Sequence, residues 1–385
     1  MFLRSPRKLL LLYGKPGSGK TTLLEYLFQW LLNLGLPYHL TGFITKEVRE
    51  GAERIGFNLL YLRDRNLSLP LARLKSLSAS KGHPVVGKYA VFSQNLDKIL
   101  EVIQNDLMEA KQPVLLFLDE IGKMEVLSEK FVAFLEHLEE EVVLVATLGT
   151  GEHPLLRAWA DLRSALYCEV TLENRDFLRD RLRVEFYRKG QIFVLEGIDG
   201  VGKSTLFQAL KDDPAFGELI FSFEPTSGLY GQRLRRLLSE KKADPQELLN
   251  LFILDRKDHV EKLILPALRE GKIILLDRYY LSTVAYQGVT FGNLLELLKL
   301  NETFAPLPDL VIYLDLSVEQ ALKRVSSRNM GRSLFEREEF LRSVSRNYEE
   351  ILPLFRHVRL PAWKTLEGLY PEVKELIQSH LKPET

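Results

Sequence analysis

Residues 195–206 read LEGIDGVGKSTL and contain the pattern G-x-x-x-x-G-K-[ST], from Gly197 to Ser204. A loop of this kind surrounds the phosphates of a nucleotide with backbone N–H groups and adds a lysine for the terminal phosphates. An apolar run, QIFVL, precedes the loop, and a helical pattern, TLFQALK, follows it. This strand–loop–helix context separates a working phosphate loop from an ordinary glycine-rich turn. The sequence therefore predicts a nucleotide-binding domain in the second half of the chain.

A second phosphate loop lies near the start of the chain, where residues 14–21 read GKPGSGKT. It also follows an apolar run, KLLLLY, and precedes a helical pattern, TLLEYLFQWLL. The lysine of this loop, Lys20, and that of the later loop, Lys203, are separated by roughly one domain length. Each loop therefore has enough chain behind it to build a core of its own.

Short, continuous apolar runs follow both loops and are typical of parallel strands that helices cover on both faces. They lie at residues 37–44, 114–119, 141–147 and 165–172 in the first half, and at 218–223, 272–277, 309–316 and 357–360 in the second. Residues 45–64 alternate polar and apolar side chains around a glycine turn, which indicates an added antiparallel hairpin. We therefore predict the α/β class, with two tandem P-loop NTPase domains of three layers at residues 1–188 and 189–385.

The composition argues against several functional classes. Lys+Arg and Asp+Glu both number 52, so no overall charge attracts nucleic acid or an anionic membrane. The one cysteine, Cys168, is expected to be a small buried apolar residue, and the seven histidines lack metal-ligand spacing. No apolar run reaches the roughly 18 residues of a membrane span. Cleavage of a signal peptide would destroy the first loop, so we expect a cytoplasmic protein that binds small nucleotides.

The first phosphate loop is accompanied by two carboxylates at a strand end. Lys20 is expected to reach the β- and γ-phosphates, and Thr21 to help hold Mg²⁺. The apolar run VLLFL ends in Asp119, the expected magnesium-side carboxylate, and Glu120 follows it. Glu120 is placed to orient or deprotonate a water molecule, unless it is simply an acidic strand end that faces solvent. A water-directed carboxylate favours hydrolysis over transfer to a second substrate.

The first half resembles the THEP1 family of small nucleoside-triphosphatases over residues 8–180. The resemblance rests on GKPGSGKTTL, GFITKEVREGAERIGF, VGKYAVF, LFLDEIGKME and TLENRD, which occur in this order. It implies Mg²⁺-dependent hydrolysis of many nucleoside triphosphates to diphosphates. The implied nucleotide contacts are Gly14, Lys15, Pro16, Gly17, Ser18, Gly19, Lys20, Thr21, Leu115, Leu116, Phe117, Leu118, Asp119, Glu120, Ile121 and Gly122. Arg49 and Lys123 are candidates for the γ-phosphate, with a surface position as the simpler interpretation.

The second loop has a different neighbourhood, because the strand at residues 272–277 ends in Asp277 and Arg278. An arginine at this strand end suits a second phosphate, since its planar guanidinium can donate two parallel hydrogen bonds to one oxyanion. Phosphoryl transfer between nucleotides needs several cations to offset charge repulsion. Arg324, Arg328 and Arg332 supply them in ALKRVSSRNMGRSLFE, which resembles a mobile lid, although a solvated basic helix is the alternative.

The second half resembles thymidylate kinases from residue 191 onward, which makes the chain a fusion of two enzyme families. The motifs are LEGIDGVGKSTL, FEPTSGLYGQRLR, LFILDR, DRYYLSTVAYQG and PDLVIYLDLSVEQALKR. The resemblance implies transfer of phosphoryl from ATP to dTMP. The implied ATP loop comprises Gly197, Ile198, Asp199, Gly200, Val201, Gly202, Lys203, Ser204 and Thr205, with Ser204 and Asp277 as Mg²⁺ ligands. The implied dTMP contacts are Asp199, Glu224, Phe252, Arg256, Arg278, Ser282, Thr283, Tyr286 and Gln287.

Within this resemblance, Phe252 would stack on thymine, Arg256 would bond its edge and Arg278 would bind the dTMP phosphate. Phe252 precedes Arg256 by four residues, so one helix face presents both. Tyr286 would crowd the 2′ position of the sugar and so select deoxyribose. Two positions depart from many relatives: Phe223 stands where an arginine is common, and the loop has Gly200 and Val201 where some carry arginine. The lid arginines are therefore expected to supply the positive charge that a loop arginine supplies in those relatives.

If Arg328 and Arg332 act from a lid, replacing either one by alanine should slow phosphoryl transfer. An arginine that neutralises charge only in the transition state contributes about 10³–10⁵ to the rate. Each variant should therefore lose kcat far more than dTMP affinity in a steady-state assay. Full turnover in both variants would contradict the lid assignment.

Three alternatives stay open at the level of sequence. The first half could be a regulatory nucleotide switch, which would hydrolyse slowly until a partner is added. It could instead be a nucleic-acid-stimulated ATPase, which the neutral charge and the lack of a basic–aromatic stripe disfavour. The second half could phosphorylate another nucleotide or a nucleoside. A homodimer through the second half is a further expectation from the resemblance.

Overall fold

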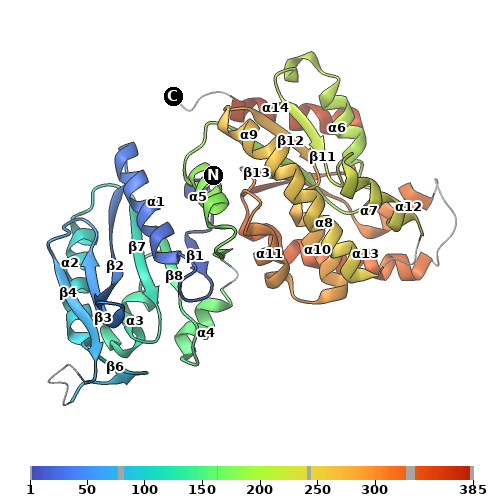
Figure 1. The fold of residues 1–385 in the computed structure, drawn as a ribbon. Helices are drawn as coiled ribbons and strands as arrows, with labels where there is room; N and C mark the ends of the chain where they lie inside the picture. The colour runs from blue at the N-terminus through green and yellow to red at the C-terminus, as the bar shows by residue number, and fades with distance from the viewer. Residues whose placement is uncertain (1, 77–81, 163, 241–243, 327–333, 382–385) are drawn as a thin grey trace. The chain divides into compact units, whose positions relative to one another are not determined.

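The computed structural model describes residues 2–76, 82–162, 164–240, 244–326 and 334–381 (Figure 1). The chain divides into two compact units, Arg7–Leu182 and Arg183–Thr385, and Met1–Pro6 belongs to the second. The division lies a few residues before the expected boundary at 188/189. It lies there because Glu185 accepts a hydrogen bond from the Leu307 N–H at 3.1 Å, and Phe186 meets the ring of Phe2 at 5.4 Å.

In the first unit, the described residues form a nine-stranded sheet in the order β5-β6-β4-β3-β2-β7-β8-β1-β9. The strands are β1 (Leu9–Tyr13), β2 (His39–Glu50), β3 (Glu53–Tyr61), β4 (Ser68–Leu74), β5 (Val85–Val86), β6 (Tyr89–Val91), β7 (Val114–Ile121), β8 (Val143–Leu148) and β9 (Ala165–Glu169). Strands β2, β7, β8, β1 and β9 pair in parallel, as the continuous apolar runs predict. The expected hairpin is β2 with β3, and three further antiparallel strands extend it.

Strand β2 consists of an apolar part and a charged part, and each part pairs with a different neighbouring strand. Its apolar first part pairs in parallel with β7, and its charged second part pairs antiparallel with β3. The expected strand at 37–44 and the first arm of the hairpin are therefore one continuous strand. The helices of the unit are α1 (Lys20–Leu34), α2 (Ser93–Glu109), α3 (Glu129–Glu136), α4 (Pro154–Ala160) and the start of α5 (Arg175–Phe186), with the short 3-10 segment η2 (Glu125–Leu127).

In the second unit, the residues that the structure describes form a parallel sheet of five strands in the order β11-β12-β10-β13-β14. The strands are β10 (Gln191–Glu196), β11 (Ile220–Phe223), β12 (Ile273–Asp277), β13 (Leu310–Asp315) and β14 (His357–Pro361). The helices are α6 (Lys203–Lys211), α7 (Leu229–Glu240), α8 (Pro245–His259), α9 (Leu265–Arg269), α10 (Tyr280–Phe291), α11 (Leu294–Glu302), α12 (Val318–Ser326), α13 (Leu334–Ile351) and α14 (Leu366–Leu381). All four strand pairings are parallel, as predicted.

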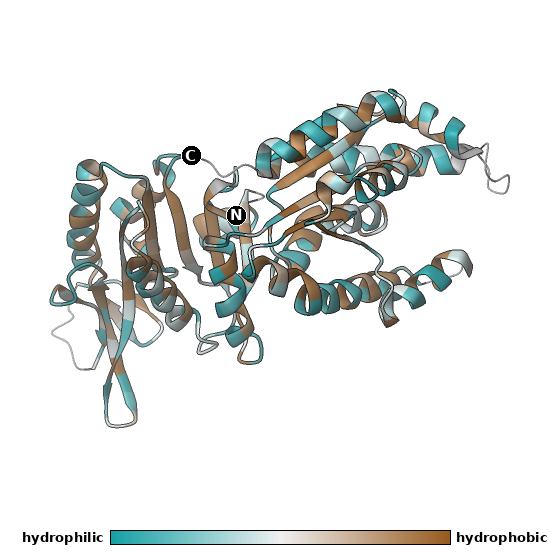
Figure 2. Cartoon of the chain, turned by 90° about the horizontal axis from the view of Figure 1, so that it is seen from above, coloured by the Kyte–Doolittle hydropathy of each residue, from teal (hydrophilic) through white to brown (hydrophobic). Residues whose placement is uncertain are grey.

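Both units place their apolar residues in the sheets and on the inner faces of the helices. Figure 2 shows brown strands and helices that alternate brown and teal, which is the pattern of helices that cover a buried sheet. Cys168 on β9 is fully buried, as expected. Within the described ranges, no helix is both long and apolar enough to cross a membrane. Both units therefore have mixed α/β folds with parallel strands, and each phosphate loop follows a strand inside its sheet.

Candidate active sites

The first phosphate loop joins β1 to α1. Gly14 has φ +145°, and an added Cβ there would lie 2.3 Å from the Val170 carbonyl oxygen, so only glycine fits. Gly19 precedes α1 with φ +102°. The Lys20 ammonium folds back over the loop and donates to the Gly14 carbonyl at 2.9 Å. The loop therefore places a lysine beside a helix N-terminus, a combination that suits an anion.

Asp119 lies at the carboxyl end of β7, where Thr147 Oγ1 donates to its Oδ1 at 2.6 Å and the Thr45 N–H donates to its Oδ2 at 3.3 Å. Burial raises the pKa of Asp119, while hydrogen bonds from Thr147 and Thr21 oppose this shift. The sequence paired Thr21 with Asp119, and the structure brings them together. A threonine hydroxyl next to a buried carboxylate is a donor set that Mg²⁺ uses alongside nucleotide phosphates.

Glu120 is held in place by two glycines. A Cβ on Gly122 would lie 2.6 Å from Glu120 Oε1, and a Cβ on Gly149 would lie 2.7 Å from the same atom. Burial and the charge of Asp119 raise the pKa of Glu120, and the charge of Lys20 opposes them. The carboxylate is therefore half-buried and lies close to the charge of Lys20. This favours a role at the phosphate loop over a solvated strand end.

A third carboxyl group, Glu125 on η2, lies beside Glu120 and was not singled out from the sequence. Its Oε2 lies 2.9 Å from the position of a Cβ on Gly122, so both side chains touch the same glycine. Burial and the charge of Glu120 raise the pKa of Glu125 to about 8. Glu125 is thus largely protonated at neutral pH and can face Glu120 without a second negative charge. The sequence signal that could have identified Glu125 is its position as the last residue of the motif LFLDEIGKME.

Gly149→Ala tests whether the position of Glu120 matters for hydrolysis. The added methyl group would displace the Glu120 carboxylate, and a shift of about 1 Å in a catalytic group can lower a rate by about 10². We expect phosphate release from ATP to fall by about 10²-fold, with nucleotide binding retained. Gly151→Ala is the control, since its Cβ would meet only the movable side chains of Leu156 and Lys123, each at 3.0 Å. Equal activity of the two variants would contradict the prediction.

The two other cations proposed for this site have different surroundings. Arg49 donates to Glu47 Oε2 at 2.6 Å and to the Ala52 carbonyl at 3.2 Å, so its partners lie on the hairpin. Lys123 packs its aliphatic chain against Gly151, at 3.0 Å from the position of an added Cβ. The structure therefore favours the simpler surface interpretation for Arg49 and gives Lys123 no described bond to the phosphate loop.

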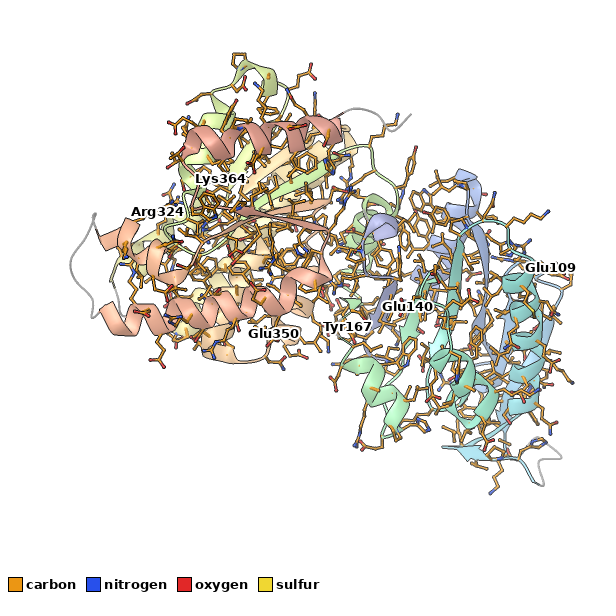
Figure 3. All side chains as sticks on the ribbon, turned by 180° about the vertical axis from the view of Figure 1, so that it is seen from behind. Glu109, Glu140, Tyr167, Arg324, Glu350 and Lys364 are labelled. Carbon is orange, nitrogen blue, oxygen red and sulfur yellow. The ribbon has the colours of Figure 1, made fainter. Side chains whose placement is uncertain are left out.

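The second phosphate loop joins β10 to α6, and its lysine is more deeply buried than Lys20 of the first loop. Lys203 is buried and donates to the Gly197 and Ile198 carbonyls at 2.8 and 2.9 Å. Burial and the nearby charge of Arg278 lower the pKa of Lys203 to about 7. Arg324, labelled on α12 in Figure 3, donates to the Val201 carbonyl at 3.3 Å. One predicted lid cation therefore already contacts the loop.

Ser204 and Asp277 form the predicted pair beside this loop. Ser204 Oγ donates to Asp277 Oδ2 at 3.0 Å. The other oxygen, Asp277 Oδ1, is buried and has no hydrogen-bond partner among the described residues. An unsatisfied carboxylate oxygen next to a loop serine fits a site for Mg²⁺.

Arg278 follows Asp277 and points across the loop. Among the described residues it is the one non-glycine residue with positive φ, +70°, which turns its side chain away from the strand. Its guanidinium donates to Asp199 Oδ1 at 2.5 Å and to Ser282 Oγ at 3.0 Å, and it lies 5.3 Å from the centre of the Tyr286 ring. Burial raises the pKa of Asp199, but Arg278 and Lys203 outweigh it and the pKa is lowered.

A cavity of about 530 Å³ opens beside Arg278 and collects the predicted acceptor residues. All nine line it: Asp199, Glu224, Phe252, Arg256, Arg278, Ser282, Thr283, Tyr286 and Gln287. Further lining residues, which the sequence did not indicate, come from α7, α8, α10 and α13 and the turns that precede them: Pro225, Leu238, Pro245, Leu248, Tyr279, Thr290 and Phe340. Helical spacing was the signal for Leu248, which precedes Phe252 by one turn.

Arg256 lines the cavity and is also bonded to the surrounding protein. Its guanidinium donates to Glu224 Oε2 at 2.8 Å, Asn301 Oδ1 at 2.5 Å and Thr283 Oγ1 at 2.8 Å. His259 also bonds Glu224, at 3.0 Å. Burial raises the pKa of Glu224, but Arg256 and His259 lower it overall. Arg256 therefore fixes the acceptor wall, and Asn301 is a partner that the sequence did not indicate.

Arg328 and Arg332 lie outside the described residues, so the lid assignment remains a prediction from the sequence. Their neighbours on both sides are placed. Arg324 contacts the phosphate loop, and Phe340 on α13 lies 6.1 Å from the ring of Tyr286.

Known proteins resemble the two halves separately. A family model described as thymidylate kinase matches residues 195–362, and one described as NTPase matches residues 9–182. A thymidylate kinase of Desulfotalea psychrophila is 40% identical over 198 residues, covering 50% of this chain and 96% of that enzyme. One of Brachyspira hyodysenteriae is 36% identical over 192 residues, covering 49% and 94%. One of Akkermansia muciniphila is 44% identical over 153 residues, covering 39% and 74%.

Proposed function

This chain belongs to the thymidylate kinase family through its C-terminal half, and we propose that this half transfers the γ-phosphoryl group of ATP to dTMP. The products would be ADP and dTDP. The observation that supports this most directly is the cavity beside Arg278, which lies next to the phosphate loop and contains every predicted acceptor residue. An acceptor held there would face the γ-phosphate of ATP in the loop.

The side chains of the loop and cavity supply positioning and positive charge. Lys203 would contact the β- and γ-phosphates, while Arg278 would hold the phosphate of dTMP. Asp199 keeps the Arg278 guanidinium oriented through the 2.5 Å ion pair. No side-chain nucleophile is needed, because the acceptor phosphate oxygen attacks the γ-phosphorus and the β–γ bridging oxygen leaves with ADP. Charge neutralisation is therefore the main contribution of the protein.

Mg²⁺ would be held at each site by a hydroxyl and a carboxylate. In the second unit these are Ser204 and Asp277, whose buried Oδ1 has no partner in the described part of the chain. In the first unit they are Thr21 and Asp119. When bound, the metal would supply positive charge that offsets the charge of the phosphates.

Selectivity for thymidylate would come from the cavity walls. Phe252 offers a ring for stacking, and Gln287 offers an amide to the base. Tyr286 stands between Arg278 and Phe340, where it would leave no room for a ribose 2′-hydroxyl. The rigid Glu224–Arg256–Thr283 contacts would hold this wall in shape.

A panel of acceptors tests the proposal: dTMP, dUMP, dCMP, dGMP and thymidine, each with ATP and Mg²⁺. We expect dTMP to have the highest kcat/KM, and thymidine to be inactive because Arg278 then has no phosphate to bind. A preference for any other acceptor in this panel would refute the assignment.

For the N-terminal half, we propose hydrolysis of nucleoside triphosphates to diphosphates and phosphate. The supporting observation is that Glu120 is wedged between Gly122 and Gly149 beside the loop of Lys20. In this position Glu120 can accept a proton from a water molecule that attacks the γ-phosphorus. Phosphate release from ATP, GTP, CTP and UTP without any acceptor would test it. Release that requires dTMP would assign the activity to the other half instead.

A further inference from the structure

The segment after β9, TLENRD, lies directly against the first phosphate loop. The Val170 N–H donates to the Tyr13 carbonyl at 2.7 Å, which continues the pairing of β9 with β1 to the start of the loop. The Val170 carbonyl then fills the space beside Gly14. The residues that follow are therefore held at one side of the nucleotide site.

Asn174 uses its side chain to build this turn. Its Oδ1 accepts from the Thr171 N–H at 2.8 Å, and its Nδ2 donates to the Glu169 carbonyl at 2.8 Å. Thr171 Oγ1 accepts in return from the Asn174 N–H at 3.2 Å. This reciprocal arrangement caps α5 and fixes where the helix begins. Asn174 therefore has a structural role, and the next residue is the one presented to the loop.

Arg175, the first residue of α5, lies over the start of α1. Its Cδ is 3.4 Å and its Nη1 is 3.8 Å from the position that a Cβ on Gly19 would occupy. The side chain is exposed, and no described residue accepts a hydrogen bond from its guanidinium. One turn later, Arg179 lies 5.4 Å from the centre of the Tyr26 ring on α1. This face of α5 is thus turned toward α1, with an unpaired guanidinium at its phosphate-loop end.

The order of the strands shows which end of a nucleotide Arg175 would meet. Strand β1 lies between β8 and β9, and β7 lies beyond β8. Asp119 and Glu120, which face the γ-phosphate in the proposed function, belong to β7 and are thus on the β7 side of the loop. Arg175 enters from the β9 side. A triphosphate in the loop would direct its nucleoside toward Arg175.

We propose that Arg175 stacks its guanidinium plane on the nucleobase bound at the N-terminal site. This inference rests on the proposed binding of nucleoside triphosphates there. A guanidinium stacks on the face of any base and reads no base edge, so this contact would favour no particular nucleotide. Arg175 would therefore set affinity for the nucleoside without setting its identity.

The test is equilibrium binding to the full chain carrying Lys203→Ala, which weakens the other loop. The probes are non-hydrolysable ATP and GTP analogues and inorganic tripolyphosphate. We expect Arg175→Ala to weaken both analogues by about tenfold, the range of one stacking contact, and to leave tripolyphosphate unchanged. Arg175→Lys should not restore binding, because it returns the charge without the plane. Arg179→Ala is the matched control and should bind all three probes normally.

Three outcomes would overturn the inference: an equal loss for tripolyphosphate, a loss for one base alone, or no loss at all. An equal loss would make Arg175 a phosphate ligand. Because binding is measured directly, a protein that binds the analogues but does not hydrolyse ATP would refute the proposed hydrolysis and leave this inference intact.

Discussion

Lys203→Ala is expected to lower dTDP formation by about 10²–10³, the effect of removing one preorganised donor from a site of developing charge. The Lys203 ammonium is buried and already points at the loop carbonyls of Gly197 and Ile198. ATP phosphates would replace these carbonyls as its partners. Arg278 is not free to fill its place, because it is bound to Asp199 and Ser282.

Lys20→Ala is the matched variant for the other unit and should show the opposite pattern. Lys20 is only half-buried and also contacts its own loop, at the Gly14 carbonyl. Its removal should abolish acceptor-independent phosphate release and leave dTDP formation unchanged. Both variants are assayed for both products. If either one lost both activities together, the two sites would not be independent, and the assignment of one reaction to each unit would be wrong.

Glu120→Gln is expected to lower phosphate release from nucleoside triphosphates by about 10²–10⁴, the contribution of a general base. The amide has nearly the shape of the carboxylate, so the fit between Gly122 and Gly149 is retained. It cannot accept a proton from the attacking water molecule. Nucleotide binding through Lys20 and the loop amides should persist, so kcat should fall much more than affinity.

The control is Glu136→Gln, an exposed glutamate on α3 of the same unit. It makes the same chemical change away from the phosphate loop and should leave hydrolysis unaffected. Turnover is followed as phosphate release, and affinity as binding of a non-hydrolysable analogue. Unchanged hydrolysis in Glu120→Gln would remove Glu120 from the mechanism and leave the unit as a nucleotide-binding switch.

Local patterns in the sequence were sufficient for much of the architecture. Both phosphate loops, the parallel strands that carry them and the hairpin at residues 45–64 are confirmed, and both family resemblances are matched by the comparisons. Apolar runs predict buried strands wherever they occur, because burial of both faces of a parallel sheet leaves no polar alternation. The antiparallel strands β4, β5 and β6 were not predicted. Of these, β5 and β6 have two and three residues, too few to show a period.

The sequence by itself determined which chemical groups this protein has and at which strand ends they lie. That follows because a phosphate loop and the residues after a buried strand are set by short-range pattern, and parallel strands bring their carboxyl ends to one edge. Only the tertiary structure decided how those groups are partnered. The bonds of Arg256 to Asn301, the wedge that Gly149 forms against Glu120 and the contact of Arg175 with Gly19 join residues distant in the chain. No local period encodes such contacts, because they depend on how whole elements pack.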